Sequence, residues 1–291
     1  MSSRSVEPFS RSIYLIESCV RTGDHKQLRP TSAHYEVGRR YKLEVSLFER
    51  MLVGGVHSRS LRTQRRMRSR VAALLVPHLY PALDTHPAVH LYPHVSGMKD
   101  DLYFYTHNVF EDTEGLEDSW SHRNSCEAVW CVSLANYLRH MRYTADDVTV
   151  LTTYSAQANL ITELSKKYAA LREVKVRVVD KYQGEESRIV ILSLVRSNKD
   201  GNIGFLAQHN RICVAMSRAR EGFYIFGNMD VLKSASTIWA SIADKLKEQN
   251  ALGRRIVLRC ETHQHVTYQV ERSEDFDSCL SPNGTCLRNC P

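Results

Sequence analysis

Short apolar runs alternate with amphipathic segments through the middle and C-terminal parts of the chain. Residues 189–195 (IVILSLV) are almost entirely apolar, as expected of a strand buried on both faces, and apolar residues recur at helical spacing between 124 and 140. The pattern predicts strands at 102–105, 148–152, 174–178, 189–195 and 223–228, and helices at 124–140, 155–167 and 210–220. Strands and helices that alternate in this way form a parallel sheet covered by helices on both faces. The sequence therefore predicts an α/β fold.

Two polar segments interrupt this pattern in the C-terminal half. Residues 178–186 (VVDKYQGEE) run from a strand into a loop, and residues 210–220 (NRICVAMSRAR) place arginines among small apolar side chains. On one helix, Arg211 and Arg218 would share a face, about 10 Å apart along the axis. A buried guanidinium requires an anionic partner. The pair therefore indicates either salt bridges with local carboxylates or a bound polyphosphate.

The two segments resemble motifs V and VI of superfamily 1 helicases, the Upf-type RNA helicases in particular. The family pattern is V-D-x-[FY]-Q-G-x-E, a buried strand, and N-V-A-[LM]-[ST]-R-A, with Cys213 standing here where the family has Asn. Arg65 replaces the Tyr that stacks on adenine in the family, and Ser69 replaces its Pro. Further matches occur in the family's order at residues 23–30 (GDHKQLRP, motif III), 46–50 (SLFER), 61–68 (LRTQRRMR, the Q-Y-R-M motif), 124–128 (NSCEA) and 153–157 (TYSAQ).

The resemblance implies a RecA-like lobe of the P-loop NTPase type and ATP with magnesium bound between two such lobes. Gln27, Arg66 and Arg218 would contact the γ-phosphate, with Arg218 as the arginine finger. The nucleotide-binding residues that the resemblance implies are Gln64, Arg65, Arg66, Gly184, Glu186, Arg211 and Arg218. The residues that it places near single-stranded RNA are Thr153, Tyr154, Gln157, Asp180 and Gln183.

Two elements of a complete helicase are missing from this sequence. No Gly is followed by Lys and no Asp is followed by Glu, so neither a G-x-x-x-x-G-K-[ST] loop nor a D-E-x-x box is present. We therefore expect a truncated helicase whose N-terminal RecA-like lobe is missing and which does not hydrolyse ATP alone. Two alternatives remain, a non-enzymatic RNA-binding or regulatory short form and a fragment of a DNA-directed, Dna2-like helicase. The expected domains are 1–45, a remnant of the first lobe with motif III; 46–235, the second lobe; and 236–291, a helical linker and Cys/His-rich tail.

The composition agrees with a nucleic-acid partner. The net charge is +7 and the pI is about 9.0, which favours polyanion binding, and 43% of residues are hydrophobic, enough for a core. The N-terminus lacks an apolar signal segment, and no run of 18 apolar residues occurs. These features predict a cytoplasmic protein, with the nucleus as an alternative. The resemblance adds RNA-silencing or RNA-surveillance complexes as partners, and a role in antiviral RNA sensing.

The C-terminal tail is rich in cysteine and histidine. Thiolate and imidazole ligands suit zinc, and the tail resembles the entry to the NFX-type zinc-finger array found in one branch of the Upf-type family. Further ligands are expected beyond Pro291, and a tail without a fixed structure is the alternative. Cys19, Cys126, Cys131 and Cys213 are expected to be reduced core thiols. The candidate zinc ligands are Cys260, His263, Cys279, Cys286 and Cys290.

A basic run and an acidic stretch complete the pattern. The run from Arg59 to Arg70 contains six arginines. It predicts phosphate contacts through Arg66 and others, or else a solvated helix face for every arginine except Arg66. Residues 111–121 are acidic and rich in turn-forming residues, which predicts a surface loop.

Overall fold

The computed structural model describes residues 21–30, 34–113, 121–279, 286–287 and 290, and the chain divides into two compact units. One unit comprises residues 1–25 and 29–59, and the other comprises residues 26–28 and 60–291. Residues 60–235 of the predicted second lobe lie in the same unit as the predicted tail, whereas residues 46–59 lie in the other unit. Cys19 lies outside the described residues.

The first unit contains two short helices, α1 (Tyr35–Arg40) and α2 (Leu47–Val53). Helix α2 begins at a capping residue, because the Ser46 hydroxyl accepts a 3.0 Å hydrogen bond from the Glu49 N–H. Glu49 also pairs with Arg29 at 2.5 Å. No residue of α2 is buried, so the helix belongs to a unit with little core of its own.

A six-stranded sheet forms the centre of the second unit, and every neighbouring pair of strands in it is parallel. This confirms the predicted parallel sheet. Strand β6 is buried at six of its seven positions, as its apolar run predicted. The strand order is β5 (Lys175–Val178), β4 (Val148–Thr152), β6 (Ser187–Ser193), β7 (Ala219–Gly227), β3 (Leu102–Thr106) and β8 (Leu252–Gly253).

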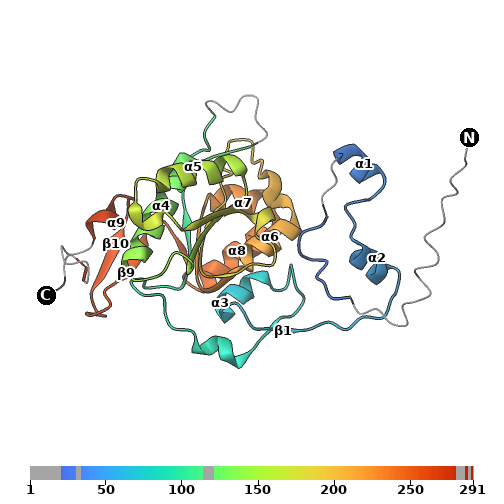
Figure 1. Cartoon of the computed structure of the whole chain (residues 1–291), viewed down its shortest axis with the longest axis horizontal. Coiled ribbons are helices and arrows are strands. Elements are labelled where there is room, and N and C mark those ends of the chain that lie inside the picture. Colours follow the sequence, from blue (N-terminus) through green and yellow to red (C-terminus); the bar gives the residue numbers. More distant parts are fainter. Residues whose placement is uncertain (1–20, 31–33, 114–120, 280–285, 288–289, 291) are drawn as a thin grey trace, which may run out of the picture. The chain divides into compact units, whose positions relative to one another are not determined.

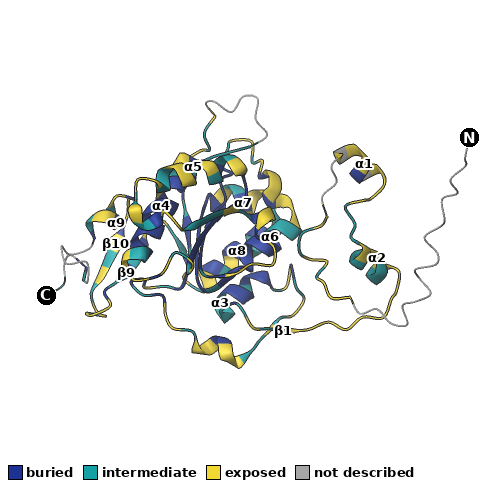
Figure 2. Cartoon of the chain, viewed as in Figure 1, coloured by how far each residue is buried: buried dark blue, intermediate teal, exposed yellow. Residues whose placement is uncertain are grey.

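Helices cover both faces of this sheet and enclose two apolar cores (Figures 1 and 2). On one face lie α3 (Ser69–Ala72), α6 (His209–Met216), α7 (Met229–Ala235) and α8 (Thr237–Glu248). On the other lie α4 (Ser125–His140) and α5 (Ser155–Ser165). Short 3-10 turns join these elements: η2 (Ala73–Leu75), η3 (Pro87–Leu91), η4 (Ala169–Leu171), η5 (Val179–Lys181) and η6 (Gly204–Ala207).

The remaining elements are small. Strands β1 (Thr63–Gln64) and β2 (Asp84–Thr85) form a two-stranded parallel sheet. An antiparallel hairpin of β9 (Ile256–Arg259) and β10 (Thr267–Val270), followed by helix α9 (Asp275–Ser278), packs beside α4.

Two predictions about secondary structure were wrong. The helix expected at 210–220 ends at Met216, and residues from Ala219 onward form β7. Pairing of β7 with both β6 and β3 outweighs the local helix preference of this segment. The basic run also forms no long helix face, because only Ser69–Ala72 is helical within it.

Candidate functional site

Three loops meet at the edge of the sheet where β6 and β7 begin. Arg218 lies between the end of α6 and the start of β7, and its carbonyl accepts a 3.1 Å hydrogen bond from the N–H of Ser187, the first residue of β6. The motif V loop therefore ends beside the motif VI arginine. Sheet pairing, rather than a shared helix, brings these two segments together.

The guanidinium of Arg218 is buried, and the residue is only 1% exposed. It donates to the carbonyls of Val214 at 3.0 Å and Glu185 at 3.2 Å, to the Ser217 hydroxyl at 2.9 Å, and to Oε1 of Gln27 at 3.1 Å. All four acceptors are neutral, and none of the described residues gives Arg218 a carboxylate partner. Burial, and then the nearby charge of Arg66, lower the pKa of Arg218. The site holds a cation whose charge is uncompensated.

Arg66 lies near Arg218, and Arg220 is linked to Arg66 through Glu186. Arg66 donates to the Ser217 carbonyl at 3.1 Å and forms a hydrogen-bonded ion pair with Glu186. The same carboxylate pairs with Arg220 at 3.7 Å. Arg66 and Arg220 thus share one carboxylate and Arg218 has none, which leaves the arginine cluster (Arg66, Arg218, Arg220 and Glu186) with two excess positive charges. Such a cluster can bind an anion with several negative oxygens.

Arg220 is a member of this cluster that the sequence analysis did not single out. Its guanidinium also lies 5.5 Å from the centre of the Tyr92 ring. Residues two apart in a strand point to the same face. If the segment had been recognised as leading into a strand, the two-residue spacing from Arg218 to Arg220 would have indicated that Arg220 belongs to the cluster.

The Q-Y-R-M segment holds Arg66 in place through Gln64. The side-chain oxygen Oε1 of Gln64 accepts from the backbone N–H groups of Arg66 at 2.9 Å and Met67 at 2.8 Å, and its side-chain amide donates to Thr85 Oγ1 at 3.1 Å. Gln64 therefore shapes the loop that carries Arg66. Arg65 is exposed.

Gly184, in the motif V loop, is exposed and adopts a φ of +87°, a conformation that glycine allows without strain.

Arg211 lies apart from the arginine cluster. Asp180 accepts from its guanidinium at 2.8 Å and 2.9 Å, and the guanidinium covers the Phe205 ring at 4.1 Å from the ring centre. The expectation that Arg211 and Arg218 share one helix face was wrong, because α6 ends before Arg218. The alternative of a salt bridge with a local carboxylate is confirmed for Arg211. Arg218 has no carboxylate partner within the described part of the chain.

The residues predicted near RNA after β4 are buried. Thr153 is 6% exposed, and Tyr154 stacks on Phe205 with ring centres 5.2 Å apart. Gln157, fully buried, accepts from the Asn124 N–H at 2.9 Å and donates to its carbonyl at 3.0 Å. These side chains hold the carboxyl edge of the sheet in place.

One exposed group at the same edge, Gln183, was predicted near RNA, and others there were not. Gln183 and Lys181 are exposed in the loop after β5, and Lys199 is exposed after β6. Phe110, which follows β3, is 50% exposed, with the Lys199 ammonium 5.9 Å from its ring centre. Asp180, also predicted near RNA, is engaged by Arg211.

A second group of functional residues gathers at the C-terminal end. Cys260, His263, Cys286 and Cys290 place one ligand atom each within 4.8 Å of one another. The His263 Nδ1 lies 3.7 Å from the sulfur of Cys260 and 3.7 Å from that of Cys286. In tetrahedral zinc, with Zn–S of about 2.3 Å and Zn–N of about 2.0 Å, sulfur and nitrogen ligands lie about 3.6 Å apart. The Cys/His group therefore could bind zinc.

Two thiols of this group, Cys260 and Cys290, differ in pKa and therefore lose their protons at different pH. Burial alone would raise the pKa of Cys260, but hydrogen bonds from the N–H groups of His263 and Leu287 and from Cys290 lower it to about 6. Burial and the hydrogen bond with Cys260 raise the pKa of Cys290 to about 11. Cys260 thus ionises first, and a thiolate is the form that binds metal.

Cys279 does not belong to the Cys/His group. Its thiol is fully buried and donates to the Phe276 carbonyl at 3.0 Å, and burial raises its pKa to about 12. The predicted set of five ligands therefore contains four that come together and one core thiol. The four lie within residues 260–290.

A family model described as an AAA domain matches residues 43–230 of this chain, a range that includes the segments resembling motifs V and VI. The chain belongs to the Upf-type helicases of superfamily 1. Among relatives of this Upf-type chain, the mouse (Mus musculus) NFX1-type zinc finger-containing protein 1 is 42% identical over 270 residues, 92% of the chain and 14% of the relative.

Two further relatives of the Upf-type chain carry the word helicase in their names. The Helicase required for RNAi-mediated heterochromatin assembly 1 of Schizosaccharomyces pombe is 36% identical over 228 residues, 77% of the chain and 22% of the relative. The mouse RNA helicase aquarius is 33% identical over 226 residues, 74% of the chain and 15% of the relative. The chain thus spans between 14% and 22% of the length of these three relatives.

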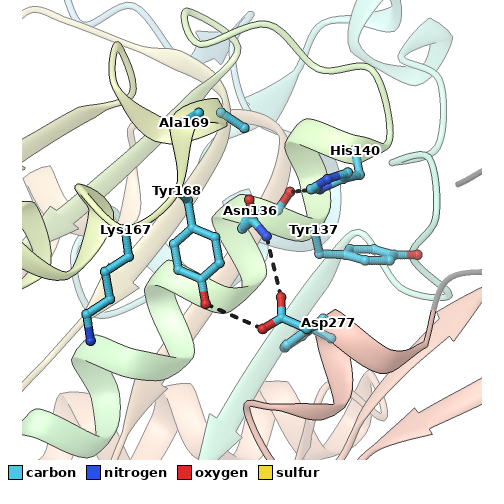
Figure 3. A pocket seen from close by; sticks show the side chains of 9 residues that line it. Asn136, Tyr137, His140, Lys167, Tyr168, Ala169 and Asp277 are labelled. Carbon is cyan, nitrogen blue, oxygen red and sulfur yellow. Dashed lines mark hydrogen bonds between the residues drawn. The ribbon is translucent and has the colours of Figure 1, made fainter. Parts of the chain in front are cut away.

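A pocket of about 510 Å³ lies away from the arginine cluster of this Upf-type chain, between α4, η4 and α9 (Figure 3). Asp277 of α9 accepts from Asn136 at 3.5 Å and from the Tyr168 hydroxyl at 3.4 Å across it. None of the predicted nucleotide or RNA residues lines this pocket. Among the described residues, no helix has the length and apolar character needed to cross a membrane.

Proposed function

We propose that this chain forms the second RecA-like lobe of an ATP-dependent RNA helicase and supplies Arg218 to the phosphates of ATP. The observation that carries the proposal is the buried guanidinium of Arg218, whose described partners are all neutral oxygens. A phosphate oxygen provides the anion that this cation lacks. Arg66 and Arg220 add positive potential around the same point.

Each residue of the arginine cluster has a distinct task in this proposal. ATP bound with magnesium supplies the phosphoryl group that is transferred. Arg218 neutralises the charge that develops on the phosphate oxygens during transfer, as an arginine finger does. Gln27 exchanges its hydrogen bond with Arg218 for one to phosphate, and Arg66 binds a neighbouring oxygen. The half-exposed Glu186 accepts hydrogen bonds from the ribose hydroxyls.

The chain depends on a first lobe for catalysis. Its sequence contains no phosphate-binding G-x-x-x-x-G-K-[ST] loop and no Asp-Glu pair for magnesium. A first RecA-like lobe would supply both, with ATP between the two lobes. The chain alone is therefore a module that completes the ATP site and does not hydrolyse ATP.

A phosphate-release assay tests this assignment. The chain is joined to the first lobe of one of its relatives and assayed with single-stranded RNA, alongside the chain alone. We expect RNA-stimulated hydrolysis only from the joined protein, and a loss of about 10³-fold or more with Arg218→Ala. Arg211→Ala is the matched control, because that arginine pairs with Asp180. Hydrolysis by the chain alone, or full activity with Arg218→Ala, would disprove the proposal.

We propose single-stranded RNA as the polymer that crosses the carboxyl edge of the sheet. The exposed Lys181 and Lys199 offer phosphate contacts there, and the exposed Phe110 offers a ring on which a base can stack. We propose participation in RNA-silencing complexes, in the cytoplasm or nucleus, because the fission yeast relative is named as a helicase required for RNAi-mediated heterochromatin assembly.

Fluorescence anisotropy with RNA and DNA oligomers of one sequence tests the choice of polymer. We expect RNA binding that weakens steeply between low and high salt, because phosphate contacts release counterions. Preference for DNA would identify a Dna2-like function instead. RNA binding by the joined protein without any ATP hydrolysis would identify a binding module.

We propose zinc as the resident ion of the Cys/His group. The geometry of its four ligand atoms carries this proposal, because three sulfurs and one nitrogen in a closed set are typical of structural zinc. Native mass spectrometry of the purified chain should show one zinc ion, which Cys286→Ala and His263→Ala abolish. Cys279→Ser should retain it. A chain without metal, or zinc lost with Cys279→Ser alone, contradicts the ligand set.

A further inference from the structure

The C-terminal segment completes the hydrophobic core on the α4 face of the sheet. Four of its apolar side chains are buried: Ile256 and Phe276 are 2% exposed, and Leu258 and Val270 are fully buried. They belong to the same core as the inward face of α4 and the central strands. The segment is therefore part of the lobe, not an appendage beside it.

Two sets of contacts attach the segment to the lobe, and the first is made of hydrogen bonds. The Arg259 N–H donates to the Gly97 carbonyl at 2.9 Å, and the Gly97 N–H donates to Glu261 Oε1 at 2.6 Å. Gly97 lies so close to Tyr137 and Met141 of the α4 end that a Cβ there would meet both at 2.6 Å. The absence of a side chain thus lets residue 97, to which the hairpin is bonded, lie close to the end of α4.

The second set of contacts that attaches the segment is aromatic packing. The Phe276 ring of α9 lies 5.5 Å from that of Tyr137 and 6.0 Å, edge to face, from that of Trp130. Both partners are on α4 and nearly fully buried. If α9 moved away, this face of α4 would be exposed to water.

The Cys/His group joins the two ends of this segment. Cys260 directly follows β9 and His263 lies in the turn before β10, whereas Cys286 and Cys290 follow α9. A shared ion therefore closes the 23-residue interval between His263 and Cys286, which includes β10 and α9. The buried Leu287, between the last two ligands, packs into the same core.

We infer that the metal in the Cys/His group is a structural element of the helicase lobe, which holds β9, β10 and α9 on α4. This inference rests on the zinc proposal above and assigns the ion a place in the lobe's own core, distinct from a separate finger. Four protein ligands leave no open coordination position, so the ion is structural. Because it binds the folded segment, its binding free energy stabilises the fold that the segment completes.

Hydrogen exchange and thermal unfolding of the complete chain test the inference. Zinc-loaded protein is compared with protein treated with a chelator and with chelated protein reloaded with zinc. We expect chelation to lower the Tm by at least about 5 °C, as loss of a structural ion should in a unit of this size. Amide exchange in α4 around Trp130 and Tyr137 should accelerate at least tenfold, and reloading should reverse both changes.

Two variants distinguish the effect of the bound ion from the effect of removing a thiol. Cys286→Ala should reproduce the chelated state without a chelator. Cys126→Ser removes a half-buried thiol from α4 itself and should behave as the unsubstituted chain. Zinc that binds and is removed with no change in Tm or in α4 exchange would overturn this inference and leave the zinc proposal standing. A purified chain that binds no zinc at all would overturn both.

Discussion

The Gln27 side chain accepts a 3.1 Å hydrogen bond from the guanidinium of Arg218, which lies 191 residues further along the chain. The Gln27 carbonyl also accepts a 2.5 Å bond from the Asn210 amide. Residues 26–28 therefore pack with the second compact unit, although the residues on either side of them belong to the first. In the proposed ATP complex, a phosphate oxygen would replace the Gln27 side-chain oxygen at this guanidinium N–H.

Replacing Arg218 with Met should separate its part in stability from its part in catalysis. An apolar side chain of similar length removes a buried charge that has no described carboxylate partner, and such replacements are often neutral for stability. We expect a Tm within about 3 °C of the unsubstituted chain, with ATP hydrolysis lost in the joined protein. Thermal unfolding followed by circular dichroism measures the first quantity. A fall of more than about 10 °C would show that Arg218 serves mainly the fold.

Glu186→Gln should strengthen phosphate binding by the chain. Glu186 is the carboxylate that pairs with both Arg66 and Arg220, so its neutralisation raises the excess charge of the arginine cluster. The pairs are half-exposed, so the gain is modest, about twofold to fivefold in affinity. Calorimetric titration with tripolyphosphate at low salt measures it. The control is Glu185→Gln, an exposed neighbour without an ion pair among the described residues. Equal effects of both substitutions would mean that only net charge matters.

Gln157→Ala should lower stability without a direct effect on RNA binding. Gln157 is fully buried and bonds to Asn124 and Ser193, so its removal leaves buried polar groups without partners. We expect a loss of about 2 kcal/mol in the free energy of unfolding, measured by urea denaturation. RNA affinity of the folded protein should change less than it does with Lys199→Ala. The reverse order would place the Gln157 side chain at the RNA after all.

Acid should weaken the amino edge of the sheet through Asp147. Burial alone would raise the pKa of Asp147, but hydrogen bonds from Thr144 and Arg188 lower it below the ordinary value. The unfolded chain then binds a proton more readily than the folded one. The stability from this group is present above the ordinary aspartate pKa and is lost as pH falls through the lowered folded pKa.

Asp147→Asn removes this titration. The urea midpoints of the two proteins should therefore differ at pH 6 and converge as the pH falls below about 4. A difference between the two urea midpoints that stays constant over this pH range would exclude Asp147 as the source of the pH dependence. Thr144→Val, which removes one hydrogen bond to the carboxylate, should give an intermediate gap.

Hydrophobic periodicity was enough for most of the fold. The strands expected at 148–152 and 102–105 and the helix at 124–140 are confirmed, because each has an apolar pattern that only one kind of element can bury. The helix expected to reach residue 220 was wrong for a tertiary reason. Residues 219–227 pair with strands on both sides, whereas the apolar pattern predicted a strand only from residue 223 onward.

The sequence by itself determined the family, the parallel sheet and the residue types of both candidate sites, because motif order and apolar spacing are local properties of the chain. Only the tertiary structure decided the partner of each side chain. Arg211 has a carboxylate and Arg218 has none in the described chain, although both lie in one motif. Cys279 is a core thiol, whereas Cys290 joins the Cys/His group. Charge pairing and ligand sets depend on which distant segments the fold brings within a few ångströms, and spacing along the chain does not contain that distance.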